Sequence, residues 1–244
     1  MSYFKLIKID ATDSTNSLMR ERYLSNNCSD GDVLFANAQL KGRGQHNSVW
    51  NSAPGKNLTL SVYREFGDIS LKNPFLISCL VSLAIQAALQ SFKIPKIYVK
   101  WPNDIMSGNK KICGLLLENI FKGSSLNASI IGIGLNVNQE AFEKLPNAAS
   151  MFQISNKNFD LDEVLNVCLT FLNQKLKLLD QPEEYILKLY EESLYRLDIA
   201  STFEADGQLF SGIIRGVTPK GLLKVQLEDF KLVAFDLKSI QLKN

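Results

Sequence analysis

The chain has 244 residues and a nearly balanced charge, with 27 Lys and Arg against 25 Asp and Glu and a net charge of +2. This balance argues against the broad basic surface of a nucleic-acid-binding protein, so we expect small anions or another protein as partners, and no DNA. The four cysteines lack paired spacing, which argues against a disulfide framework and a zinc site, and we expect no protein-held metal. The first residues lack an apolar signal core, so we expect a cytoplasmic protein.

Strand and helix patterns alternate along the first 194 residues and predict an α+β fold with a mixed sheet. The expected strands are 3–10, 32–38, 57–63, 96–101, 112–119 and 128–138. The expected helices are 14–25, 74–92, 139–146, 160–179 and 182–192. Residues 74–89 carry no charge, but this run is short for a membrane span and favours a buried helix.

The texture of the sequence changes after about residue 194. Short alternating strands follow, separated by Asp-Gly, Pro-Lys-Gly and Glu-Asp turns. Such spacing is typical of a small β-barrel. We therefore expect two domains, 1–194 and 195–244.

Near the amino terminus, Ser14, Thr15 and Asn16 precede an amphipathic run. Ser14 or Thr15 is a good helix cap, because a side-chain oxygen there can accept from a free backbone N–H. The same hydroxyl and amide groups could equally face a polar pocket, and both roles are compatible.

The next informative segment, 36–62, holds Lys41-Gly42-Arg43-Gly44 and then Trp50. Glycines beside an arginine let the main chain approach a ligand and present N–H groups and a guanidinium to an anion. The pattern therefore predicts a phosphate or carboxylate site. Trp50 could stack on a ligand or fill the core.

The segment 98–118 places Lys100 at the end of a strand, because Pro102 cannot continue the backbone pairing. Residues 107–109 are typical of a turn, after which a buried strand resumes. On its own, Lys100 could simply extend its charged end to solvent. The final segment, 130–138, is a buried strand that ends in amides, with Asn136 after Gly132-Ile133-Gly134. It is not a dinucleotide fingerprint, because Val137 stands where the third glycine belongs.

Taken together, these four segments resemble the catalytic domain of biotin–protein ligases. The signatures are Ser14-Thr15-Asn16, Gln39 with 42–50, 100–114 (KWPND and the downstream Lys and Gly), and 132–136. Their order and spacing are highly specific, and the resemblance extends over roughly residues 3–240. It is strongest from 35 to 138.

The resemblance implies an enzyme that uses ATP with Mg²⁺ to convert biotin to biotinyl-5'-AMP and then biotinylates a lysine of a biotin carboxyl carrier domain. It implies Lys100 and Arg43 as catalytic residues. The biotin-binding residues it implies are Ser14, Thr15, Asn16, Gln39, Arg43, Gly44, Gln45 and Lys100. The ATP-binding residues are Arg43, Trp50, Asn103, Lys111 and Asn136, and a Src-homology-3-like barrel is implied for the C-terminal domain.

One loop departs from the common family pattern GRG-R-x-G-R, because this chain has Gln45, His46, Asn47 and Ser48. Gln45 removes a cation and Asn47 removes a glycine, so we expect adenylate retention to rely more on Arg43, Lys56 and backbone donors. His46 is the only histidine, and its place in a Gly-rich loop argues against a nucleophile that depends on it.

Two other functions remain open at this stage. Lipoate–protein ligases and octanoyltransferases share the fold, although KWPND with Trp50 favours biotin. A non-catalytic binding protein is the second alternative, which the retained Lys100, Arg43 and Lys111 argue against. The catalytic signature starts almost at the first residue, so we expect no DNA-binding repressor module. A homodimer is compatible with the sequence.

Overall fold

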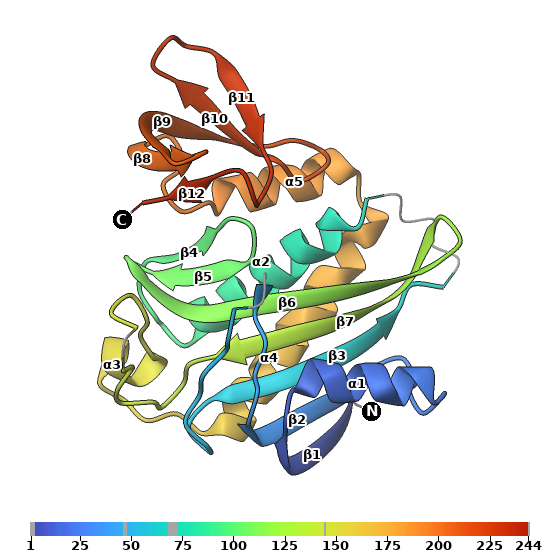
Figure 1. The fold of residues 1–244 in the computed structure, drawn as a ribbon. Helices are drawn as coiled ribbons and strands as arrows, with labels where there is room; N and C mark the ends of the chain where they lie inside the picture. The colour runs from blue at the N-terminus through green and yellow to red at the C-terminus, as the bar shows by residue number, and fades with distance from the viewer. Residues whose placement is uncertain (1–2, 46–47, 68–72, 144, 244) are drawn as a thin grey trace.

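The structure is a computed structural model that describes residues 3–45, 48–67, 73–143 and 145–243. Its larger sheet has seven strands in the order β1-β2-β3-β7-β6-β5-β4, as Figure 1 shows. The strands are β1 (Lys5–Thr12), β2 (Asp32–Gln39), β3 (Leu58–Glu65), β4 (Ile97–Lys100), β5 (Asp104–Ser107), β6 (Lys110–Lys122) and β7 (Ser125–Leu135). β1 and β2 pair in parallel and the other neighbours pair antiparallel, which confirms the mixed sheet.

Helices cover the two faces of this sheet unequally (Figure 1). One face packs against α2 (Phe75–Ser91) and α4 (Leu161–Leu176), and α2 contacts both α4 and α5 (Glu183–Glu192). The other face carries α1 (Thr15–Leu24) over a small core that includes Met19 and Tyr63. Further helical pieces among the described residues include α3 (Met151–Ser155) and a 3₁₀ turn at Lys177–Asp180.

Helix α2 is the apolar segment expected at 74–92, and its 17 residues are buried along almost their whole length. Burial on several sides explains the absence of charge in its sequence. Among the described residues, no helix has both the length and the apolar character needed to cross a bilayer.

The C-terminal part forms a second, five-stranded antiparallel sheet in the order β11-β10-β9-β8-β12. Its strands are β8 (Ala200–Ala205), β9 (Gln208–Val217), β10 (Leu223–Leu227), β11 (Leu232–Phe235) and β12 (Gln241–Leu242). The separate small β unit is thus confirmed, although the described residues leave the edge strands β11 and β12 unpaired with each other. Its buried residues Phe203, Val217 and Val225 belong to the same apolar cluster as α2.

The expected helix at 139–146 is wrong. The described residues of that segment form no helix, and the chain becomes helical at α3. Side chains satisfy the backbone there instead: the Ser150 hydroxyl donates to the Gln139 carbonyl at 2.6 Å, and Asn138 exchanges hydrogen bonds with Phe159. Ser150 and Gln153 then form a capping box that starts α3.

A second difference concerns 96–109. The predicted strand is β4, which ends at Lys100, and the predicted turn contains Gly108 at φ +54°. Between them lies β5, a short strand that the sequence pattern did not reveal. β5 pairs with both β4 and β6, so it fixes the position of the Lys100 strand end relative to β6.

Candidate active site

A cavity of about 790 Å³ opens on the α1 side of the large sheet and extends to the C-terminal sheet. Most residues that the sequence nominated line this cavity, namely Ser14, Thr15, Asn16, Gln39, Arg43, Gly44, Gln45, Trp50, Lys100, Asn103 and Lys111. Asn136 and Lys56 do not line it, and Lys56 Nζ lies 3.7 Å from Glu140 Oε1. Segments more than 80 residues apart therefore meet at one site. His46 and Asn47 lie outside the described residues.

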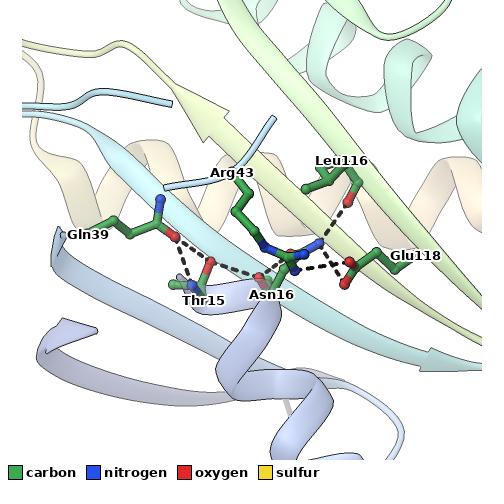
Figure 2. A network of polar contacts seen from close by, with 7 residues as sticks. Thr15, Asn16, Gln39, Arg43, Leu116 and Glu118 are labelled. Carbon is green, nitrogen blue, oxygen red and sulfur yellow. Dashed lines mark hydrogen bonds and ion pairs between the residues drawn. The ribbon is translucent and has the colours of Figure 1, made fainter. Parts of the chain in front are cut away.

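The start of α1 forms one end of the cavity through a chain of hydrogen bonds (Figure 2). The Thr15 backbone N–H and hydroxyl both donate to Gln39 Oε1, at 2.8 and 3.0 Å. The Ser61 hydroxyl lies 2.8 Å from Thr15 Oγ1 and 2.5 Å from Asn16 Oδ1. Ser14 occupies the N-cap position, but its side chain makes no capping hydrogen bond. The described contacts therefore leave this hydroxyl available to the cavity that it lines.

The loop between β2 and β3 brings Arg43 over this end of the cavity. Gly44 N–H donates to Ser48 O at 2.7 Å, and Trp50 N–H donates to Gly42 O at 2.9 Å. A side chain at residue 42 would collide with the Trp50 carbonyl, so the close approach requires glycine. The Arg43 guanidinium donates to Glu118 Oε1 at 3.0 Å.

Trp50 lies on a surface built from glycines. Gly114 on β6 is the cross-strand partner of Gly134 on β7, and both lie against the indole ring. Lys111 Nζ lies 5.8 Å from the centre of the ring. The indole Nε1–H is buried and has no hydrogen-bond partner among the described residues. The Trp50 ring packs on the sheet and also lines the cavity. Core packing and ligand stacking are therefore compatible roles for this residue.

The lysine cluster lies at the β4–β5 end of the cavity. Lys111 Nζ lies 2.7 Å from Asp104 Oδ1, whereas Lys100 forms no ion pair with any described carboxylate within 4.0 Å. Burial lowers the pKa of the half-buried Lys100 ammonium, an effect that Asp104 opposes and Lys111 reinforces. A partly desolvated ammonium without a carboxylate partner is suited to binding an incoming anion.

The residues on either side of Lys100 are bonded to residues from the C-terminal half of the chain. The Trp101 indole N–H donates to Gly221 O at 2.9 Å, and the Tyr190 hydroxyl donates to Pro102 O at 3.1 Å. Tyr195 N–H donates to Val99 O at 2.8 Å. Lys100 therefore sits on a segment bonded on several sides, as accurate positioning of a reacting group requires.

Asn136 lies away from the cavity. Its Nδ2 donates to Ala149 O at 3.0 Å, and its Oδ1 is buried without a described partner. The amide therefore ties the end of β7 to the segment before α3, and a nucleotide contact from Asn136 stays a prediction. Asn103 does line the cavity, but its Nδ2 donates to Leu115 O.

Several polar residues at the site were not found from the sequence. Ser61 and Glu118 join the hydrogen-bond network, and Asp104 pairs with Lys111. Ser61 lies opposite Gly132 across the β3–β7 pair, on the face that carries α1. Ser61 and Thr59 alternate with the apolar residues Leu58, Leu60 and Val62 of β3, and this polar alternation was the available signal. The cavity wall from the C-terminal sheet, which includes Asp206 and Lys238, gave no local signal.

Comparison with known proteins identifies the family of this chain. The model of the Biotin/lipoate A/B protein ligase family matches residues 9–136, more than half of the chain, and the chain belongs to this family. The Bifunctional ligase/repressor BirA of Bacillus subtilis is 28% identical over 231 residues, which cover 92% of this chain and 70% of that protein. The Biotin–[acetyl-CoA-carboxylase] ligase of Mycobacterium tuberculosis is 31% identical over 146 residues, or 59% of this chain and 53% of that protein.

Solved structures extend the likeness to the whole fold. A biotin protein ligase from Aquifex aeolicus in complex with biotin and ATP superposes with a TM-score of 0.82 at 26% identity. The match covers 98% of this chain and 99% of that chain. The C-terminal sheet is therefore part of the shared architecture.

Proposed function

We propose that this chain is a biotin–protein ligase, which activates biotin with ATP to biotinyl-5'-AMP and transfers it to a lysine of a biotin carboxyl carrier domain. The observation that carries the proposal is one cavity that joins a polar, uncharged end at Thr15 and Gln39 to a cationic end at Lys100 and Lys111. The similar Aquifex aeolicus protein was solved with biotin and ATP together.

The first half-reaction brings two anions together. A biotin carboxylate oxygen attacks the α-phosphorus of ATP, the bond to the bridging oxygen breaks, and pyrophosphate leaves with that electron pair. Negative charge on the reacting oxygens has to be neutralised as they approach. Lys100 would contact the carboxylate and the α-phosphate, while Arg43 and Lys111 would neutralise the remaining phosphate oxygens.

ATP would react as its Mg²⁺ complex, and the metal charge would help to neutralise the departing pyrophosphate. Among the described residues, no group of three or more His, Cys, Asp or Glu side chains could hold a metal ion. Asp104, a carboxylate beside the lysines, is already paired with Lys111.

The uncharged end of the cavity suits the ureido ring of biotin, which needs hydrogen-bond partners rather than ions. Ser14, Thr15, Asn16 and Gln39 would supply them, with Gly44 and Gln45 along the chain of the substrate. Trp50 and Asn103 would line the nucleotide side. Residues 1–194 would form the catalytic domain and 195–244 the smaller domain, a division supported by the two separate sheets.

In the second half-reaction, a lysine amine of the carrier domain attacks the acyl carbon of the adenylate, and AMP leaves. The cavity reaches the C-terminal sheet at residues 204–207 and 237–242. The adenylate is a reactive mixed anhydride. Enclosing it between the two sheets would protect it from water until the carrier lysine arrives.

The decisive experiment offers the purified protein biotin, lipoate or octanoate with Mg-ATP and measures pyrophosphate release. We expect release with biotin, followed by labelling of a carrier domain. Turnover of lipoate without biotin would instead support the lipoate ligases of the same fold. Absence of release with all three acids would favour a binding protein.

A further inference from the structure

Glu118 is a carboxylate at the edge of the site that the proposed reaction does not use. It lies on β6, and its side chain is 19% exposed. Its Oε1 accepts from the Arg43 guanidinium at 3.0 Å. Arg43 lines the cavity but Glu118 does not, so Glu118 holds the arginine from outside the space that ligands would occupy.

A side chain of helix α1 helps to hold Glu118 in place. Asn16 Nδ2 donates to Leu116 O at 3.1 Å and approaches Glu118 Oε2 at 3.4 Å. Asn16 is in turn bonded to Ser61. Figure 2 shows the resulting contacts between Gln39 and Thr15 and from Asn16 to Glu118 and Arg43. Ser61 joins the two parts, because its hydroxyl bonds both Thr15 and Asn16.

This pairing changes what Arg43 can offer a ligand. A guanidinium that neutralises Glu118 is a weaker electrostatic partner for a second anion, and the standing carboxylate repels that anion. Arg43 is 44% exposed, so solvent screens the pair and its strength is modest. A ligand carboxylate or phosphate can therefore compete for the guanidinium.

We propose that Glu118 is a positioning residue that holds Arg43 in the ligand-free protein and yields it to the carboxylate or phosphate oxygens of the ligand. The inference rests on the proposed function, because it requires an anionic ligand in the cavity. In the ligand-free protein Glu118 takes the place of the ligand anion. It keeps Arg43 near the site but lowers the affinity of the site for an anionic ligand.

The test measures binding of biotin alone, ATP alone, and biotinol, the alcohol that lacks the carboxylate. Glu118→Gln keeps the shape and removes the charge, so biotin or ATP should bind about two- to fivefold more tightly, the range carried by a part-exposed ion pair. Biotinol binding should not change. A gain confined to biotin identifies the carboxylate as the competing anion, and a gain confined to ATP identifies the phosphate.

Two controls separate this role from a structural one. Asp198→Asn makes the same change in net charge at the exposed Arg215–Asp198 pair and should leave all three affinities unchanged. In an Arg43→Gln background, Glu118→Gln should no longer improve binding. Glu118→Asp, which keeps the charge, should stay closer to wild type.

Steady-state kinetics add a readout that simple destabilisation would not produce, since Glu118→Gln should lower KM with little change in kcat. If Glu118→Gln does not fold, Glu118→Ala serves as the second neutral variant. Unchanged or weaker binding of both biotin and ATP, or an equal gain for biotinol, overturns the inference. Continued pyrophosphate release in that case leaves the proposed function standing.

Discussion

The indole ring of Trp50 lies directly on the backbone of Gly134: a Cβ atom at residue 134 would fall 2.5 Å from ring atom Cε2. A Cβ at the cross-strand partner Gly114 would fall 3.1 Å from Cζ3. Gly132, two residues before Gly134, makes the same kind of room for the amide of Asn16. The Gly-x-Gly spacing therefore serves packing, since it places two open positions on one face of β7.

We predict that Gly134→Ala displaces the Trp50 ring, because the added methyl group would overlap it. Overpacking of this kind should lower the free energy of unfolding by about 1–3 kcal/mol. ATP affinity should fall if the ring lines the nucleotide side. Tryptophan fluorescence and ATP titration measure the two effects. Gly132→Ala is the matched control, since it would disturb Asn16 instead and should leave Trp50 emission close to that of wild type.

We predict that Lys100→Ala lowers the rate of adenylation by about 10²–10³, as expected when one preorganised electrostatic contact is lost. The fold should persist, because Lys100 is half-buried and makes no described ion pair. Pyrophosphate release gives the rate, and circular dichroism checks folding. A folded variant with near-normal adenylation would show that Lys100 is an ordinary strand-end lysine.

The lowered pKa of Lys100 predicts an alkaline limit to activity. Burial favours the neutral amine, so the ammonium is lost at a pH below the 10.5 of an ordinary lysine. Catalysis that needs the charge is present below this pKa and declines as the pH rises through it. The pH profile of kcat/KM reports this group in the free enzyme.

Lys100→Arg is the control for this profile, because the arginine keeps its charge throughout the accessible range. The variant should lose the alkaline decline, whatever its absolute rate. Persistence of the same decline in Lys100→Arg would assign the titration to another group.

We predict that Gln45→Arg slows dissociation of the adenylate. Gln45 lines the cavity next to Gly44, where a guanidinium could reach the phosphate. A hydrogen bond to a charged group contributes about 1.5–3 kcal/mol before the entropy of ordering the side chain is subtracted. The adenylate off-rate of wild type and variant decides the matter. An unchanged or faster off-rate would mean that residue 45 points away from the phosphate, and Gln45→Lys would then be expected to fail as well.

The sequence by itself was sufficient to predict structural features that depend on single residues or on residues close together in the chain. Apolar periodicity located α2 and the central strands, and the proline and glycine at positions 102 and 108 marked the end of β4 and the turn after β5. These signals are local because backbone donors and allowed dihedral angles belong to single residues. The motifs also named eleven of the residues that line the cavity, since each motif lies at or near the place where a strand or helix begins or ends.

Only the tertiary structure decided which groups meet. Nothing near Glu118 in the sequence predicts its pairing with Arg43, 75 residues away. The Trp101–Gly221 bond spans 120 residues, and the helix expected at 139–146 gave way to contacts with Ser150 and Phe159. A hydrogen bond or ion pair depends on distance and burial, which are set only when the sheets and helices pack.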